Sequence, residues 1–202
     1  MDKSSHENTP RSAVDLNAAR RVPRSIFAII LILSAGLYWF AAYGDTPAPV
    51  KTVKNFYQGY FDRDFDTVAQ NLSVFWSVRF LSDEYASMTP AELLENRTKI
   101  EKEISAVIAD SEKENPVPSG VNVKIMKDYT QVGQKSAIVV YSFIENGKDV
   151  GMEASILILE KSKFRIFNMS PIDDTSLDQI KSLDMSIIDN NFAELLDNPH
   201  AE

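Results

Sequence analysis

The sequence predicts an α+β domain that follows a single N-terminal transmembrane helix, and three observations lead to this fold class. Residues 25–43 contain no charged side chain. Beginning at Val50, apolar side chains recur at helical spacing, and from Val121 onward they alternate with a period of two, which is typical of strands. Because the helices precede the strands, we expect a curved antiparallel sheet that wraps around the helices as a cone.

The apolar stretch 25–43 has the length of a membrane span. Its nineteen residues, as a helix, just cross a hydrocarbon core of roughly 30 Å. Arg20, Arg21 and Arg24 precede it, and positive charge marks the cytoplasmic flank, so the rest of the chain is expected outside. A cleaved secretion signal ending at Ala42-Tyr43-Gly44 is the alternative, but such signals have apolar runs of only about 7–15 residues. We therefore predict a single-pass anchor in the cytoplasmic membrane.

These features divide the chain into five predicted parts. The parts are a disordered cytoplasmic tail (1–24), the transmembrane helix (25–43), a proline-containing linker (44–49), the folded domain (50–172) and a helical C-terminal extension (173–202). Two prolines in the linker favour an extended chain, which would lift the domain off the membrane.

The first half of the domain is predicted to be helical. One amphipathic helix begins at Val50, and a second, short one follows Asp64. Residues 73–88 are apolar but have no clear period, so we expect a loop or a short irregular helix there. Thr89-Pro90-Ala91-Glu92 combines a Thr cap, a first-turn Pro and a Glu three residues after the cap, which predicts a helix start. That helix is expected to end near Glu114, before a Pro-rich stretch.

The second half is predicted to form a four-stranded antiparallel sheet. Apolar and β-branched residues place the strands at 121–129, 137–144, 155–160 and 164–169. Asn146-Gly147 is the strongest short signal for a hairpin turn, so the second and third strands are expected to be neighbours.

The C-terminal extension has a helix-start signal at Asp173 and an apolar series that is interrupted at Asp184. One broken helix or two short helices are predicted. This amphipathic segment could pack on the domain's own sheet, or it could dock in a groove of a partner. In the second interpretation, Ile188 and Phe192 are the candidate partner-binding residues.

Composition excludes several functions. The chain has no cysteine, and its two histidines, His6 and His200, are in the terminal segments. Thiolate nucleophiles, cysteine zinc sites and a histidine-based catalytic centre inside the domain are therefore excluded. Residues 1–24 carry five basic and three acidic side chains, so the net charge of −8 leaves −10 on residues 44–202. A domain this acidic is not expected to bind nucleic acid.

Asp62, Asp64 and Asp66 resemble the start of a calcium-binding loop. Such a loop needs a glycine at its sixth position and a bidentate glutamate at its twelfth, and here these positions are Thr67 and Ser73. We therefore expect no metal site. Asp64 or Asp66 is instead predicted to cap the N-terminus of the following helix.

The aromatic helix and acidic turn in FYQGYFDRDFDTVAQNL, and the last strand in FRIFNMSPID, resemble the nuclear transport factor 2-like superfamily over residues 48–172. The resemblance implies a cone-shaped α+β domain. This superfamily includes enzymes, binding modules and scaffolds, so the likeness does not define a function. Its enzymatic members keep a ligand pocket at the mouth of the cone. The residues that would line such a pocket here are Tyr57, Tyr60, Trp76, Tyr141 and Phe143.

The expected function is that of a membrane-anchored extracytoplasmic interaction or scaffold domain of a cell-envelope complex, without catalysis or cofactor. Other envelope proteins, or further copies of the chain, are the expected partners. The alternative is a small-molecule-binding or enzymatic cone with an aromatic pocket. An enzyme of the superfamily's small-molecule isomerase or hydrolase type is the competing class. A pocket of several hundred Å³ in which a buried carboxylate faces a tyrosine hydroxyl would favour the enzyme, and a cone filled by its own side chains would favour the interaction module.

Overall fold

The computed structural model describes residues 24–39, 46–114, 116 and 120–197, and the chain divides into two units, Met1–Asp45 and Thr46–Glu202. In the first unit, helix α1 covers Arg24–Trp39. No helix in the described part of the chain combines the length and the apolar character that crossing a membrane requires. The predicted span 25–43 extends past α1, and its residues 40–43 lie outside the described residues, as do residues 1–23 of the predicted tail and residues 44–45 of the predicted linker.

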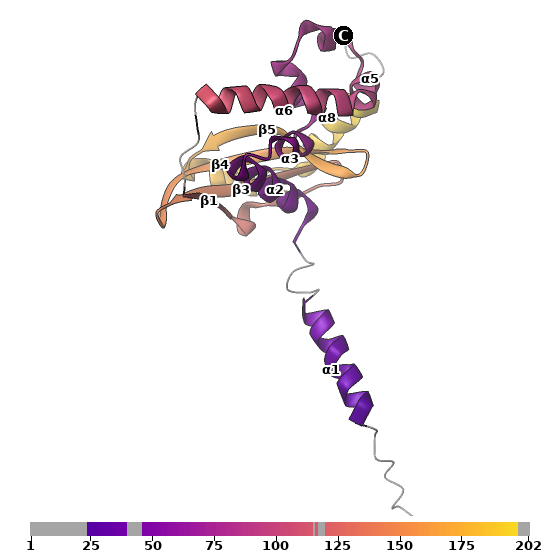
Figure 1. Cartoon of the computed structure of the whole chain (residues 1–202), viewed down its shortest axis with the longest axis vertical. Helices are drawn as coiled ribbons and strands as arrows, with labels where there is room; N and C mark the ends of the chain where they lie inside the picture. The colour runs from indigo at the N-terminus through magenta and orange to yellow at the C-terminus, as the bar shows by residue number, and fades with distance from the viewer. Residues whose placement is uncertain (1–23, 40–45, 115, 117–119, 198–202) are drawn as a thin grey trace, which may run out of the picture. The chain divides into compact units, whose positions relative to one another are not determined.

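The second unit is an α+β domain in which helices pack on an antiparallel sheet, which confirms the predicted class (Figure 1). The helical half contains α2 (Ala48–Asp62), α3 (Phe65–Asn71), α4 (Val74–Ser77), the 3-10 helices η2 (Val78–Phe80) and η3 (Asp83–Ser87), α5 (Pro90–Glu95) and α6 (Arg97–Glu114). The second half contains β1 (Val121–Ile125), the 3-10 helix η4 (Lys127–Tyr129), β2 (Gln131–Val132), β3 (Ser136–Glu145), β4 (Lys148–Glu160), β5 (Lys163–Ile172), α7 (Asp174–Lys181) and α8 (Met185–Asp197).

The sheet has the strand order β1-β3-β4-β5, and the short strand β2 also pairs with β3. The sheet therefore has five strands where four were predicted. The chain between Ile125 and Gln131 leaves the sheet through η4, so the single strand expected over 121–129 is shorter. The β3–β4 turn is formed by Asn146 and Gly147, which both have positive φ angles of 51° and 76°. A two-residue hairpin turn of this kind requires that conformation, and it confirms the predicted hairpin.

Both faces of β3 are covered. Ala137, Val139 and Tyr141 pack against α2, α3 and α6, which lie together over one face of the sheet (Figure 1). Ile138 and Val140 point to the opposite face, where residues of α7 and α8 cover them. Because side chains alternate along a strand, a strand covered on both faces is buried at nearly every position.

The turn between α2 and α3 confirms the predicted capping role of the aspartates. Asp64 is the N-cap of α3, and its carboxylate accepts a 3.1 Å hydrogen bond from the Thr67 amide and a 2.7 Å bond from the Thr67 hydroxyl. Asp66 has a different role, because it accepts a 2.7 Å hydrogen bond from the Ser105 hydroxyl of α6. The acidic turn therefore both starts α3 and fastens it to α6.

The long helix predicted between Pro90 and Glu114 is divided. Its start has the expected capping box between Thr89 and Glu92, but the helix ends at Glu95 and α6 begins at Arg97. Asn96 separates the two helices, and its side-chain amide and backbone N–H both donate to the Glu92 carbonyl. Asn competes well for backbone groups at helix ends, which explains the break.

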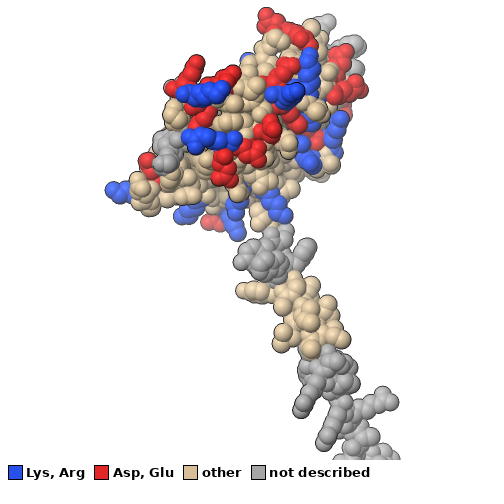
Figure 2. All heavy atoms as spheres, in the orientation of Figure 1, with Lys and Arg blue, Asp and Glu red and all other residues tan. Residues whose placement is uncertain are grey.

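Charged residues of α6 form ion pairs both in the interior of the domain and on its surface. The Arg97 guanidinium contacts the buried Glu160 carboxylate at the end of β4, and the Ser73 hydroxyl donates a 2.6 Å hydrogen bond to that carboxylate. On the exposed side, Lys99 lies 2.6 Å from Glu84. Figure 2 shows basic and acidic side chains interspersed over the face in view.

Candidate functional site

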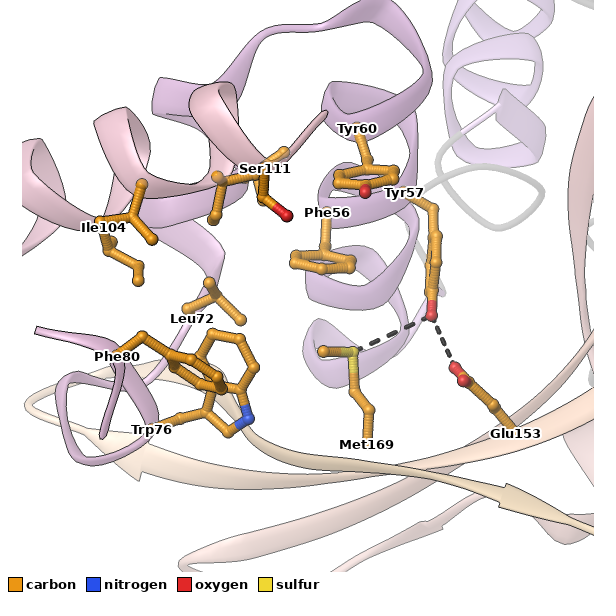
Figure 3. Close-up of a pocket in the computed structure, with 13 residues that line it drawn as sticks. Phe56, Tyr57, Tyr60, Leu72, Trp76, Phe80, Ile104, Ser111, Glu153 and Met169 are labelled. Carbon is orange, nitrogen blue, oxygen red and sulfur yellow. Dashed lines mark hydrogen bonds between the residues drawn. The ribbon is translucent and has the colours of Figure 1, made fainter. Parts of the chain in front are cut away.

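A pocket of about 340 Å³ lies between the helices and the inner face of the sheet (Figure 3). Most of its wall is apolar, and its polar groups come from a few side chains. The thirteen residues that line it are Phe56, Tyr57, Tyr60, Val68, Leu72, Trp76, Phe80, Ile104, Val107, Ile108, Ser111, Glu153 and Met169. Side chains therefore do not completely fill the space between the helices and the sheet.

Helical spacing explains how one wall of the pocket forms. Ile104, Val107, Ile108 and Ser111 follow the i, i+3, i+4, i+7 pattern, so they share one face of α6. Val107 and Ser111 are exposed at the rim, whereas Ile104 is buried at depth. This face of α6 therefore extends from solvent into the pocket.

Aromatic rings form much of the remaining wall. Phe56 and Tyr60, one turn apart on α2, are stacked with their ring centroids 6.3 Å apart. Trp76 of α4 and Phe80 of η2 have centroids 4.5 Å apart. Phe80 is 53% exposed although it is a large apolar residue. The pocket therefore has an apolar rim at the side of Phe80, where a ligand could enter.

Glu153 is the polar centre of the site. The Tyr57 hydroxyl donates a 2.7 Å hydrogen bond to its Oε2, and the Tyr141 hydroxyl donates a 2.8 Å bond to the same atom. The Tyr57 and Tyr141 hydroxyl oxygens are 3.0 Å apart, and Tyr141 also lies 2.9 Å from the Ser155 hydroxyl. Among the described residues, no donor reaches the other Glu153 oxygen, Oε1. One carboxylate oxygen is thus fixed in place, and the other remains an available acceptor.

The pairing of β3 and β4 brings these groups together. Tyr141 and Glu153 are directly opposite each other in the antiparallel register. Glu153 and Leu157 are four positions apart on β4 and therefore face the helices together, and Leu157 belongs to the core there. A shift of the register by one residue would turn Glu153 to the other face of the sheet.

Both tyrosines of the site remain protonated hydrogen-bond donors at neutral pH. Burial raises the pKa of the Tyr57 hydroxyl far above its usual value, and the neighbouring Tyr141 and Glu153 raise it further. Burial also raises the pKa of the Tyr141 hydroxyl, and the charge on Glu153 adds to this effect. Ionising either hydroxyl would place a second negative charge beside the carboxylate without full hydration.

The five predicted pocket residues gather at this site in two groups. Tyr57, Tyr60 and Trp76 line the pocket. Tyr141 lies behind the wall and holds Glu153, and the Phe143 ring packs edge-on against Tyr57 with a centroid distance of 5.3 Å. These two residues therefore support the pocket rather than line it.

Sequence reasoning missed Glu153, which is the central residue of the site. The sequence did contain a signal for it. Glu153, Ser155 and Leu157 are at alternate positions of one strand and therefore share a face of the sheet, and Ser155 and Leu157 are buried on that face. Its partner across the sheet could not be assigned without the register. The apolar pocket residues on α3, α6 and β5 were missed as well, because a core residue and a pocket residue share the same helical or strand spacing.

The two predicted partner-binding residues lie against the domain itself. Phe192 of α8 is only 7% exposed, and its ring packs on Phe167 of β5 with a centroid distance of 4.9 Å. Ile188 is partly buried and contacts the apolar clusters on the same side of the sheet. Both side chains therefore agree with the interpretation in which the segment packs on the domain's own sheet, and their binding to a partner stays a prediction.

Comparison with known proteins identifies no relative: no family model, no curated protein and no solved structure matches the chain. The resemblance to the nuclear transport factor 2-like superfamily therefore stays a prediction. The fold and site by themselves define an α+β domain that has an open, mostly apolar pocket with one carboxylate.

Proposed function

We propose that the domain is a binding module for a small, largely apolar molecule, which places a polar group against Glu153. The observation that carries this proposal is the single carboxylate, held by two tyrosine hydroxyls, in an otherwise apolar pocket. Ligand sites in proteins are mostly apolar cavities in which a few fixed polar groups set the orientation of the ligand. A volume of about 340 Å³ suits a small organic molecule.

Three hydroxyl groups around Glu153 use their protons within the site. Tyr57, Tyr141 and Ser155 each have one hydroxyl proton. Tyr57 and Tyr141 use theirs on Glu153 Oε2, and the Ser155 hydroxyl can donate to the Tyr141 oxygen. None of these three protons is then left for a ligand, so the three hydroxyls serve to hold the carboxylate in one position.

Methionine NMR provides a test of ligand binding in the full-length chain. Met169 lines the pocket, whereas Met126 and Met185 pack in the cluster on the opposite face of the sheet. With methyl-labelled methionine, N-phenyl-1-naphthylamine should shift the Met169 signal and leave the Met126 and Met185 signals unchanged. Loss of one signal in Met169→Leu identifies the resonance.

A pair of variants on α6 makes the test specific. Val107→Trp should close the rim of the pocket, because Val107 lines the pocket and is 40% exposed. Ala106→Trp adds the same ring at the neighbouring exposed position, which does not line the pocket. Binding should be lost in Val107→Trp and kept in Ala106→Trp. Equal shifts in both variants, or no shift of Met169 in the wild type, would contradict the proposal.

We further propose that residues 25–43 hold this module on the outer side of a cytoplasmic membrane. The observation in favour is the surface of α1, whose apolar side chains are exposed: Ile29, Ile30, Leu31, Ile32, Leu33 and Leu37 are 53–70% accessible. A continuous apolar surface of this kind requires a cover, which the acyl chains of a bilayer would provide. Protease added to intact spheroplasts that express the chain should digest the domain. Protection until lysis would overturn this topology.

A further inference from the structure

The pocket contains one charged group and no positive one. Glu153 is the only Asp, Glu, Lys, Arg or His among the thirteen described residues that line it. Within the described part of the chain, Glu153 accepts hydrogen bonds from the two tyrosine hydroxyls and forms no ion pair with a Lys or Arg. The electrostatic character of the pocket is therefore negative, which favours a positively charged ligand.

The aromatic residues of the wall also favour a positively charged ligand. Phe56, Tyr60, Trp76 and Phe80 line the pocket with rings from two separate helical segments, α2 and α4–η2. The face of an aromatic ring carries partial negative charge and attracts organic cations, most strongly in the case of Trp. The same rings also bind an apolar skeleton. A carboxylate together with aromatic walls suits one kind of molecule, in which a cationic group is attached to an apolar body.

We propose that the ligand is a protonated amine with an apolar or aromatic body, and that its N–H group donates to Glu153 Oε1. This inference rests on the proposed binding function and adds the chemical class of the ligand. Oε1 is the carboxylate oxygen that no donor among the described residues reaches. Carboxylic acids and phosphates are expected to bind poorly, because they would bring a second negative charge beside Glu153.

Three probes with one aromatic body test the class of ligand. They are 1-naphthylmethylamine, which is protonated at neutral pH, 1-naphthylmethanol, which is neutral, and 1-naphthoate, which is anionic. The affinity of the full-length chain for each is measured from the shift of the Met169 methyl signal. The amine should bind about tenfold more tightly than the alcohol, because a charge-assisted hydrogen bond and cation–π attraction are added. The naphthoate should bind most weakly.

Variants at Glu153 and at a surface glutamate separate charge at the site from charge elsewhere. Glu153→Gln should abolish the preference for the amine over the alcohol. Glu95→Gln removes one negative charge from an exposed position on α5, outside the pocket, and should keep the preference. If Glu153→Gln fails to fold, the comparison of the three probes on the wild-type chain still decides.

The outcomes distinguish the two proposals. If the alcohol binds at the Met169 site as tightly as the amine, the pocket binds apolar molecules but the cationic class is wrong. If the naphthoate binds best, the cationic class is also wrong. If no probe shifts the Met169 signal, the proposed binding function itself fails.

Discussion

The Tyr57 hydroxyl donates a 2.7 Å hydrogen bond to Glu153 Oε2, although the two residues are 96 positions apart in the chain. The contact joins α2 to β4 between the helices and the sheet, and Tyr141 of β3 donates to the same oxygen. The polar centre of the pocket therefore depends on three elements, and it should contribute to stability as well as to ligand binding.

The first prediction concerns the stability that this contact provides. Tyr57→Phe leaves the ring in place but removes one of the two donors to Glu153 Oε2, so we expect the free energy of unfolding to fall by about 1–2 kcal/mol. Urea unfolding measures it. Tyr129→Phe is the control, because the Tyr129 hydroxyl has no hydrogen-bond partner within the described ranges, and it should cost much less. Equal losses in the two variants would refute a stabilising role for the contact.

The second prediction concerns alkaline pH. Tyrosine in the unfolded chain ionises near its ordinary pKa of about 10, whereas burial raises the pKa of Tyr57 and Tyr141 well above this value in the folded domain. The stability that these groups provide is fully present below about pH 10 and is lost as the pH rises further, because only the unfolded state then releases their protons.

The wild-type free energy of unfolding should therefore fall as the pH rises above about 10, and it should fall less in the double variant Tyr57→Phe/Tyr141→Phe. Urea unfolding at each pH gives this slope, and absorbance of tyrosinate shows when tyrosines ionise. An identical slope for the wild type and the double variant would show that the two hydroxyls titrate normally.

The third prediction concerns the C-terminal helix α8. Phe192 is buried against Phe167, whereas Ile187 on the same helix is 60% exposed. Phe192→Ala should destabilise the domain by about 3 kcal/mol, since it removes a ring from the core and leaves a cavity. Ile187→Ala should change the stability by less than about 0.5 kcal/mol. Thermal unfolding compares the two. If Phe192→Ala leaves the stability of the domain unchanged, the interpretation that α8 docks on a partner is favoured instead.

The fourth prediction concerns Asp189, which fastens α8 to the turn between β2 and β3. Its carboxylate accepts hydrogen bonds of 2.7 Å and 2.8 Å from the amides of Gln134 and Lys135, and one of 2.6 Å from the Ser136 hydroxyl. Burial raises the pKa of Asp189, but these hydrogen bonds outweigh burial and hold the pKa below its ordinary value.

Asp189→Ala should lower the free energy of unfolding at neutral pH by about 2 kcal/mol, because three donors lose a charged acceptor. This stability is present above the ordinary Asp pKa of about 4 and is lost as the pH falls through the lower folded pKa. The difference between Asp189→Ala and the wild type should therefore shrink in acid. Asn190→Ala, at the next and exposed position, is the control. A difference that does not change with pH would contradict the role of the ionised carboxylate.

Much of the fold could be predicted from the sequence because its signals are local. The hairpin at Asn146-Gly147 and the cap at Asp64 depend on residues within one turn, and both were found where predicted. The interruption at Asp184 was also correct, since α7 and α8 are separate helices. The break at Asn96 was missed, because Asn is tolerated inside helices and no other local signal accompanies it.

The sequence by itself determined the α+β class, and of the five aromatic residues that it predicted for the pocket, three line it, namely Tyr57, Tyr60 and Trp76. Only the tertiary structure decided that a pocket remains between the helices and the sheet and that Glu153 lines it. The physical reason is that hydrophobic spacing shows which face of an element is covered, but not how completely facing side chains fill the space between elements. The β3–β4 register and the packing of α8 likewise depend on contacts between residues far apart in the chain, which local patterns do not contain.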